Sequence, residues 1–429
     1  MKKRAITMVV VMALAAAACG GDGDATDDTS ADTSADTSAD EVPETSDSTT
    51  AEPESTDAPS APTGDPIVLA MISLESGPAS LPDARQAAEA AVAYVNAELG
   101  GAAGRPLVLE TCITDGSPEQ SSACANQLLE RDPLAFVGEL DIGTAGSMPI
   151  IENSGVPRIG AAAVTPELLF SPMSFAFGLD LVPGWSAWTQ YMVNEIQATT
   201  VNVVSVDFSG AETIGQIIAS VAEANGASVG ERSLFPLDAT DVSPQMAAAA
   251  ASSPDAIIAV PTGASCVPLL LAHASLAPDI PFLVPGICGD PRIIDAAGAA
   301  AEGVLVGFSR LNPFDTSDPE VATYRRALDE YSDEEVALSE FASNSFAAVL
   351  NVKDLIDELG PEVTSATLTD AVAATKDQHN FMGEPYSCDQ AGKLTPNTCA
   401  NSQRILQIQG GVLVDVGGAW FDASDQAKL

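Results

Sequence analysis

Basic residues are scarce in this sequence, and so are histidines. It has 17 Lys and Arg against 60 Asp and Glu, which gives a net charge of −43 over 429 residues. Phosphate binding needs Lys and Arg to replace counterions, so this balance argues against a nucleic-acid partner. Two histidines, His273 and His379, argue against a multi-histidine metal site. The length predicts two or three domains with ample core.

Motifs that mark common catalytic sites are also missing. There is no G-x-S-x-G, no P-loop, no H-E-x-x-H, and no G-x-G-x-x-G after the first predicted strand. His273 lies in the apolar stretch 269–276 and is expected to be structural, while His379 is expected on an exposed loop. Asp141 and Asp207 each follow a predicted strand, where they either bind a polar ligand or cap the next helix. We predict a protein that is not an enzyme and holds no metal.

The longest apolar run lies at the front of the chain, and no later run approaches the roughly 18–20 residues that span a bilayer. Three basic residues, 2–4, precede the apolar residues 5–18, as in an export signal. Cys19 follows a run of alanines that ends in Ala16-Ala17-Ala18 and resembles a bacterial lipobox, although Ala16 stands where that motif usually has leucine. We predict that residues 1–18 are a signal peptide and that Cys19 carries a lipid. The alternative is ordinary signal-peptidase cleavage with an incidental Cys19.

Residues 20–65 have the composition of a disordered tail. They contain Ala-Asp-Thr-Ser repeats, fourteen acidic residues, no basic residue and no aromatic residue. Such a segment buries too little apolar surface to offset its ordering entropy. We therefore predict that residues 19–65 are an acidic tether, which would hold the folded part away from a membrane surface.

Apart from Cys19, the cysteines come in three pairs of sequence neighbours. Export favours disulfides, and no C-x-x-C pattern indicates a metal site. We predict structural disulfides among Cys112, Cys124, Cys266, Cys288, Cys388 and Cys399. Proximity in the sequence does not by itself prove which cysteine pairs with which.

From residue 66 onward, short apolar runs alternate with stretches of helical periodicity. Strands are predicted at 67–72, 106–110, 134–137, 156–160, 200–206, 227–235, 256–260, 281–284 and 303–308. Helices are predicted at 83–99, 143–153, 211–224, 242–251, 266–276, 292–297 and 338–359, and a hairpin at 405–416. Strands that alternate with helices predict parallel sheets covered on both faces, and two such runs predict two Rossmann-like α/β lobes.

In open α/β sheets, ligands bind beyond the carboxyl ends of the strands. The loops that this rule selects are 73–78, 138–144, 161–165, 207–210, 261–265 and 285–290. They are rich in Gly, Ser and Thr and have no paired catalytic groups. We therefore expect binding rather than catalysis there.

Short motifs along residues 66–429 resemble a known family when they are taken together. In order they are Ser76-Gly77-Pro78, Tyr94-Val95-Asn96, Gly100–Arg105, Val137-Gly138, Gly155-Val156-Pro157, 239–245 and Ala301-Glu302-Gly303-Val304. Their order and spacing resemble the type I periplasmic binding proteins. The resemblance is closest to the leucine/isoleucine/valine-binding branch of ABC transporter substrate-binding lipoproteins, and the cysteine pairs and acidic tether look like actinobacterial members.

This resemblance implies two lobes joined by a three-strand hinge, with 66–177 and 310–384 in lobe I and 178–309 and 385–429 in lobe II. It implies a monomer without a cofactor, exported and anchored by its lipid to the outer face of the cell membrane. Such a protein binds a small organic solute between the lobes and delivers it to an ABC permease and ATPase complex. The alternatives are a ligand-sensing module that signals to a membrane sensor, and a secreted hydrolase.

The family's binding residues transfer only partly to this sequence. Positions whose hydroxyls hold the ligand carboxylate fall on Ile142 and Val164, which have none, while a backbone contact on Ala162 is retained. The acidic residue that holds an ammonium falls on Ser265 or Cys266. A buried ammonium without a counter-charge costs on the order of several kcal/mol, so a standard zwitterionic amino acid is disfavoured.

An ammonium would need Glu75 or Asp207 as its counter-charge; otherwise the ligand is an amide, a carboxylate or an aromatic acid. Trp185 and Phe208 either stack on such a ligand or pack helix against sheet. The candidate ligand-binding residues are Ser73, Glu75, Asp141, Ile142, Gly143, Thr144, Ala162, Ala163, Val164, Thr165, Trp185, Asp207, Phe208, Ser209, Thr262, Gly263 and Ser265.

Overall fold

The structure is a computed structural model that describes residues 60–76, 80–138, 140–207, 210–389, 394–418 and 420–423. The predicted signal peptide and Cys19 lie outside these residues, as do Phe208 and Ser209. Within the described residues, no helix combines the length and hydrophobicity needed to cross a membrane. Near the start of the described chain, the Thr63 N–H donates to the Gly104 carbonyl at 2.9 Å, so the end of the predicted tether is bound to the folded part.

The first sheet is parallel and has five strands in the order β2-β1-β3-β4-β5. They are β1 (Ile67–Leu74), β2 (Leu107–Thr114), β3 (Ala135–Val137), β4 (Arg158–Ile159) and β5 (Ser174–Phe175). The helices around it are α1 (Pro82–Glu98), α2 (Pro118–Leu129), α3 (Thr144–Ser154), α4 (Pro166–Phe170), α10 (Pro319–Tyr331), α11 (Glu340–Leu359) and α12 (Ser365–Ala373).

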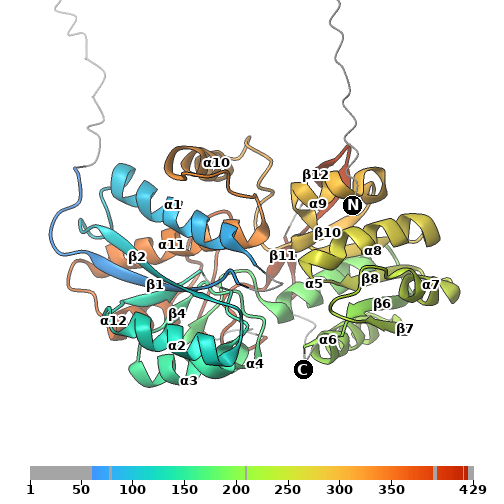
Figure 1. Cartoon of the computed structure of the whole chain (residues 1–429), viewed down its shortest axis with the longest axis horizontal. Helices are drawn as coiled ribbons and strands as arrows, with labels where there is room; N and C mark the ends of the chain where they lie inside the picture. The colour runs from blue at the N-terminus through green and yellow to red at the C-terminus, as the bar shows by residue number, and fades with distance from the viewer. Residues whose placement is uncertain are drawn as a thin grey trace, which may run out of the picture. The chain divides into compact units, whose positions relative to one another are not determined.

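Side chains of β1 alternate between the two helical layers. Leu69 and Met71 pack with α1 and α11, while Ala70 and Ile72 pack with α2 and α3 on the other face (Figure 1). A parallel strand buried on both faces needs such a continuous apolar run, because neither side meets water. The layered α/β architecture predicted from the sequence is confirmed here.

The second sheet has eight strands, seven of them in the order β12-β11-β10-β9-β8-β6-β7, with β13 paired to β11. They are β6 (Thr200–Val206), β7 (Ser228–Phe235), β8 (Ala256–Val260), β9 (Phe282–Pro285), β10 (Leu305–Phe308), β11 (Ser402–Gln409), β12 (Val412–Asp415) and β13 (Phe421–Asp422). Its helices are α5 (Leu181–Asn194), α6 (Ala211–Ala224), α7 (Ser243–Ala251), α8 (Gly263–Leu276), α9 (Pro291–Ala297) and the short 3₁₀ helices η1 (Gly286–Gly289) and η2 (Gly298–Ala301).

Strands β6 to β10 of the second sheet are parallel, as predicted, and the C-terminal strands make the sheet mixed. β11 runs antiparallel to β10, β12 and β13, because the chain returns to this sheet through the C-terminal hairpin. The predicted hairpin itself is confirmed. Its turn has φ of 62° at Gly410 and 79° at Gly411, a left-handed conformation that favours glycine.

The predicted disulfides are present, and each joins two cysteines that are neighbours in the sequence. They are Cys112–Cys124, Cys266–Cys288 and Cys388–Cys399. The first ties β2 to α2, and the second ties α8 to η1. Each short closed loop restricts the unfolded chain and contributes about 2–4 kcal/mol to stability.

The chain passes three times between the two sheets, after β5, after β10, and between α12 and β11. The second crossing carries Arg310, whose side chain is fully buried. Its Nη1 donates to Asn380 Oδ1 at 2.5 Å and to the Phe381 carbonyl at 3.1 Å. Its Nη2 donates to Asn344 Oδ1 at 3.1 Å. Burial lowers the pKa of Arg310 to about 10, so the side chain stays protonated at neutral pH.

Two of these partners reach the strand ends of the first sheet. Asn344 Nδ2 donates to the Gly160 carbonyl at 2.8 Å, directly after β4. Asn380 Nδ2 donates to the Phe177 carbonyl at 2.8 Å, at the first crossing. Arg310 therefore connects all three crossings through hydrogen bonds to buried polar groups.

Replacing Arg310 by leucine is expected to lower the free energy of unfolding by about 3–5 kcal/mol, because buried oxygens of Asn344 and Asn380 lose a charged donor. Denaturant unfolding followed by circular dichroism measures this. Arg326→Leu is the control: Arg326 is half exposed and pairs with Glu98, so its loss costs about 1 kcal/mol or less. Equal effects of the two substitutions would contradict the role given to Arg310.

Candidate functional site

Glu75, in the loop after β1, already has a cationic partner. Arg85 of α1 donates through Nε to Glu75 Oε1 at 2.6 Å and through Nη2 to Oε2 at 3.1 Å. Burial by itself raises the pKa of Glu75, but the hydrogen bonds from Arg85 and Ser73 outweigh it and keep the pKa below its usual value. Ser73 lies at the end of β1 and is buried. The charge of Glu75 is thus neutralised within the protein, which weakens its candidacy as counter-charge for a ligand ammonium.

Asp141, in the loop after β3, is fully buried and bound by its neighbours. Oδ1 accepts from Ser121 Oγ at 2.7 Å and from the Gly143 N–H at 2.9 Å, at the start of α3. Oδ2 accepts from Ser147 Oγ at 2.5 Å and lies 3.6 Å from Arg158 Nη1. Of the two roles open for Asp141, ligand contact or helix cap, the contacts support the structural one.

The loops after β3 and β4 meet through their threonines. Thr144 Oγ1 lies 2.6 Å from Thr165 Oγ1 and 3.0 Å from Glu167 Oε2. Ile142 is 46% exposed, so an apolar side chain stands at the surface of this loop pair. The structure therefore brings together these predicted residues of the first sheet.

Ala162 and Ala163 lie buried where β4 leads into the next loop. The Val164 N–H donates to the Ala162 carbonyl at 3.0 Å, which makes a tight turn. Ala163 exchanges backbone hydrogen bonds of 2.9 and 3.0 Å with Leu179 and Leu181 at the first crossing. Movement at that crossing would therefore be transmitted directly to this loop.

On the second sheet, Thr262 and Ser265 form a reciprocal cap at the start of α8. The Thr262 N–H donates to Ser265 Oγ at 2.9 Å, and Gly263 is the first residue of the helix. Asp207 is exposed at the end of β6, and its N–H donates to the Phe235 carbonyl at 2.8 Å. Thus the Ser265 hydroxyl is engaged in the cap, whereas the Asp207 side chain faces solvent.

Trp185 is part of the core beneath the second sheet rather than of an open surface. It is 6% exposed and packs edge-on against Trp188, with ring centroids 5.1 Å apart. Trp188 in turn covers Gly307 of β10 so closely that a Cβ on this glycine would overlap its ring. Of the two roles considered for Trp185, packing of helix against sheet is supported.

Both histidines have structural contacts. His273 Nε2 lies 2.8 Å from the Ile280 carbonyl, and its ring stacks on Phe282 at 4.3 Å. Burial lowers the pKa of His273. His379 is exposed and lies 2.6 Å from Glu320 Oε1. Within the described ranges, no group of three or more His, Cys, Asp or Glu side chains is placed to hold a metal ion.

Sequence reasoning missed a buried acidic group where elements of the two sheets touch. Ser339 and Glu340 open α11, and Glu340 Oε1 accepts from the Ser309 N–H at 2.7 Å, just after β10. Ser339 Oγ donates to Asp83 at the start of α1. Burial raises the pKa of Asp83, and it raises that of Glu340 to about 7. In the sequence, a serine followed by one acidic residue indicates only the start of a helix.

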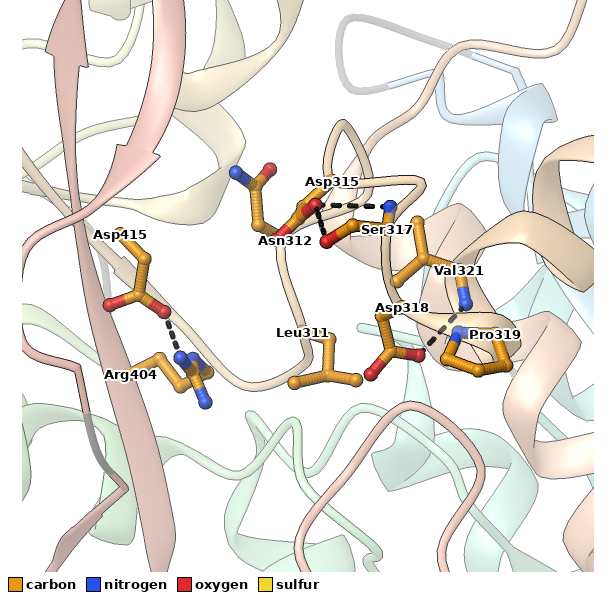
Figure 2. A pocket seen from close by; sticks show the side chains of 9 residues that line it. All are labelled: Leu311, Asn312, Asp315, Ser317, Asp318, Pro319, Val321, Arg404 and Asp415. Atoms are coloured by element: carbon orange, nitrogen blue, oxygen red, sulfur yellow. Dashed lines mark hydrogen bonds and ion pairs between the residues drawn. The ribbon is translucent and has the colours of Figure 1, made fainter.

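A cavity of about 300 Å³ lies between the segment leading into α10 and the β11–β12 hairpin (Figure 2). It is lined by Leu311, Asn312, Asp315, Ser317, Asp318, Pro319, Val321, Arg404 and Asp415. None of these is a predicted ligand residue. Arg404 pairs with Asp415, and Asp318 caps α10 by accepting from the Glu320 N–H at 2.8 Å. These polar side chains are thus already bound to other groups of the protein.

Several solved structures of solute-binding proteins have this fold. A possible leucine/isoleucine/valine-binding protein from Rhodopirellula baltica SH 1 is 18% identical, with a TM-score of 0.70 over 82% of this chain and 96% of that chain. A solute-binding protein of an ABC transporter from R. palustris, in complex with benzoate, is 17% identical, with a TM-score of 0.68 over 83% and 97%. A branched-chain amino acid transporter substrate-binding protein from Streptococcus pneumoniae, in complex with isoleucine, is 17% identical, with a TM-score of 0.67 over 82% and 100%.

Two α/β lobes joined by three crossings, together with these likenesses, define the type I periplasmic binding protein fold. The model of the periplasmic binding protein family matches residues 66–408, more than half of the chain. The chain belongs to this family, whose members bind solutes outside the cytoplasm. The sequence matches no curated protein.

Asp141→Ala is expected to lower the free energy of unfolding by about 3–5 kcal/mol, because it removes one partner of a buried ion pair. Thermal or denaturant unfolding measures the change. Asp238→Ala, at an exposed loop position, should stay within about 0.5 kcal/mol of the parent. Unchanged stability with loss of solute binding would contradict the structural role and assign Asp141 to the ligand.

Proposed function

We propose that this protein is the solute-binding lipoprotein of an ABC importer. It captures a small organic solute between its two lobes and delivers it to a membrane permease and ATPase complex. The observation that carries this proposal is the pair of α/β lobes, which three crossings of the chain connect. Each lobe has loops at its strand ends, where ligands of such sheets bind. Family membership supports it. Residues 66–177 with 310–384 form lobe I in this proposal, and 178–309 with 385–429 form lobe II.

In this proposal, binding of the solute favours closure of the two lobes. A solute held between the lobes leaves water, so its polar contacts strengthen in the lower dielectric. It shifts the open–closed equilibrium by the difference between its affinities for the two states. Three crossings held together by Arg310 confine this motion to a hinge.

The solute in this proposal is an amide, a carboxylate or an aromatic acid rather than a standard amino acid. Ile142 and Val164 supply apolar surface where the related proteins place hydroxyls. Glu75 is already paired with Arg85, so it brings no free negative charge for an ammonium. Asp207 is the remaining acidic candidate. The solved relatives in complex with isoleucine and with benzoate show that this fold accommodates both ligand classes.

A thermal-shift screen of amino acids, amides, short carboxylates and aromatic acids is expected to find at least one ligand of micromolar affinity. At a hundredfold excess over its dissociation constant, such a ligand adds about 2.7 kcal/mol to the stability of the folded state. Benzoate-like acids should shift the melting temperature more than leucine or valine. Tight leucine binding would contradict the solute class, and no shift by any of these classes would contradict the transport role.

Anchoring is the second part of the proposal. The full chain made in a bacterial host should incorporate labelled palmitate and fractionate with the membrane, because Cys19 follows an export signal. Cys19→Ala should remove the label and release the protein, while Ser30→Ala in the same tail should change neither. An unlabelled, unanchored parent would contradict lipidation and leave signal-peptidase cleavage as the explanation.

A further inference from the structure

Glu340 lies where segments from the two lobes meet. It is the first residue of α11, which packs on α1 beside the first sheet, and it is 2% exposed. Its Oε1 accepts from the Ser309 N–H at 2.7 Å, directly after β10 of the second sheet. The carboxylate thus contacts the residue at which the chain leaves β10 for the second crossing.

The other carboxylate oxygen faces a glycine of the second sheet. Gly286 begins η1 after β9, and a Cβ at this position would overlap Glu340 Oε2. A side chain at this position would therefore displace the Glu340 carboxyl. Since Gly286 and Glu340 belong to different lobes, opening of the hinge would part them and admit water to the carboxylate.

Charged groups surround this contact on each neighbouring element. Arg310 attracts Glu340 from the crossing. Asp83 of α1 is bound by Ser339, next to Glu340. On the second lobe, Asp290 is held by Arg292 through bonds of 3.0 and 2.5 Å. Arg292 is paired with Asp290, and Glu340 forms no ion pair within the part of the chain that the structure describes.

We propose that Glu340 is a positioning residue for lobe closure and that it takes up a proton from solvent when the lobes close. This inference rests on the two-lobed clamp of the proposed function. In the open state water solvates the carboxylate. In the closed state the carboxylate loses this water, and the neutral carboxylic acid is the cheaper species to bury between Ser309 and Gly286.

The direction of the pH effect follows from linkage. Burial raises the pKa of Glu340 to about 7 in the described state, against 4.5 for an ordinary glutamate. The closed state, in which the carboxyl is buried and its pKa is raised, binds more protons than the open state. It is therefore favoured as the pH falls, and it loses this advantage as the pH rises through 7. The ratio of closed to open protein should be about tenfold higher at pH 6 than at pH 8.

The test measures lobe separation without any solute. Spin labels at Ala123→Cys on α2 and Gln216→Cys on α6, both exposed, report the distance by pulsed electron paramagnetic resonance. The parent should shift toward the short distance at pH 6. Glu340→Gln, which mimics the neutral acid, should show the short distance at both pH values. Glu223→Gln, at an exposed position on α6, should respond like the parent.

Two further measurements test the contact with Gly286 and the titration of Glu340 separately. Gly286→Val should lengthen the distance at both pH values, because its side chain overlaps the carboxyl. A carbon-13 titration of the parent should give Glu340 an apparent pKa near 7. A pH response that persists in Glu340→Gln, a parent insensitive to pH, or an ordinary pKa for Glu340 would overturn the inference. These readouts need no ligand, so a failed solute screen would count against the proposed function alone.

Discussion

A single buried guanidinium organises the hinge of this protein. Arg310 has no exposed surface, and burying a charge is costly unless hydrogen bonds offset its loss of water. Asn344, Asn380 and the Phe381 carbonyl provide the acceptors. Because the two asparagines also hold the carbonyls of Gly160 and Phe177, one side chain fixes the crossings relative to the strand ends of the first sheet.

This arrangement separates two packed lobes from the three crossings between them. Each sheet has its own apolar layers, so each lobe is stabilised independently of the solute. The Cys266–Cys288 disulfide keeps α8 and η1 together, which steadies two loops at the strand ends of the second lobe. In the proposed function, a ligand would therefore reposition the lobes rather than build them, and small differential contacts would suffice to shift the equilibrium.

Alternation of strands and helices could be predicted because buried parallel strands leave continuous apolar runs. Thr200–Val206, Ala211–Ala224 and Ala256–Val260 have the predicted bounds. Short elements escaped prediction: α4 has five residues and β5 two, too few for any periodicity to emerge. The antiparallel return of β11 beside β10 depends on where the chain re-enters the sheet, which no local pattern records.

Loops of the candidate site could be selected by topology, whereas the roles of their side chains could not. Asp141 is a candidate because it follows a strand, but its oxygens are engaged by Ser121 and Ser147, and neither partner is evident from spacing. Ser265 likewise serves the cap of α8. The significance of Glu340 arises from contact with Ser309, 31 residues away in the sequence. Such long-range pairings require the folded chain.

The most direct test of the central claim is a crystal structure of the protein with a solute identified by binding. We expect the solute to be enclosed between the lobes, in contact with the loops around Ile142 and Ala162 on one side and around Asp207 and Thr262 on the other. A solute bound to one lobe alone, or in the cavity beside Arg404, would contradict it.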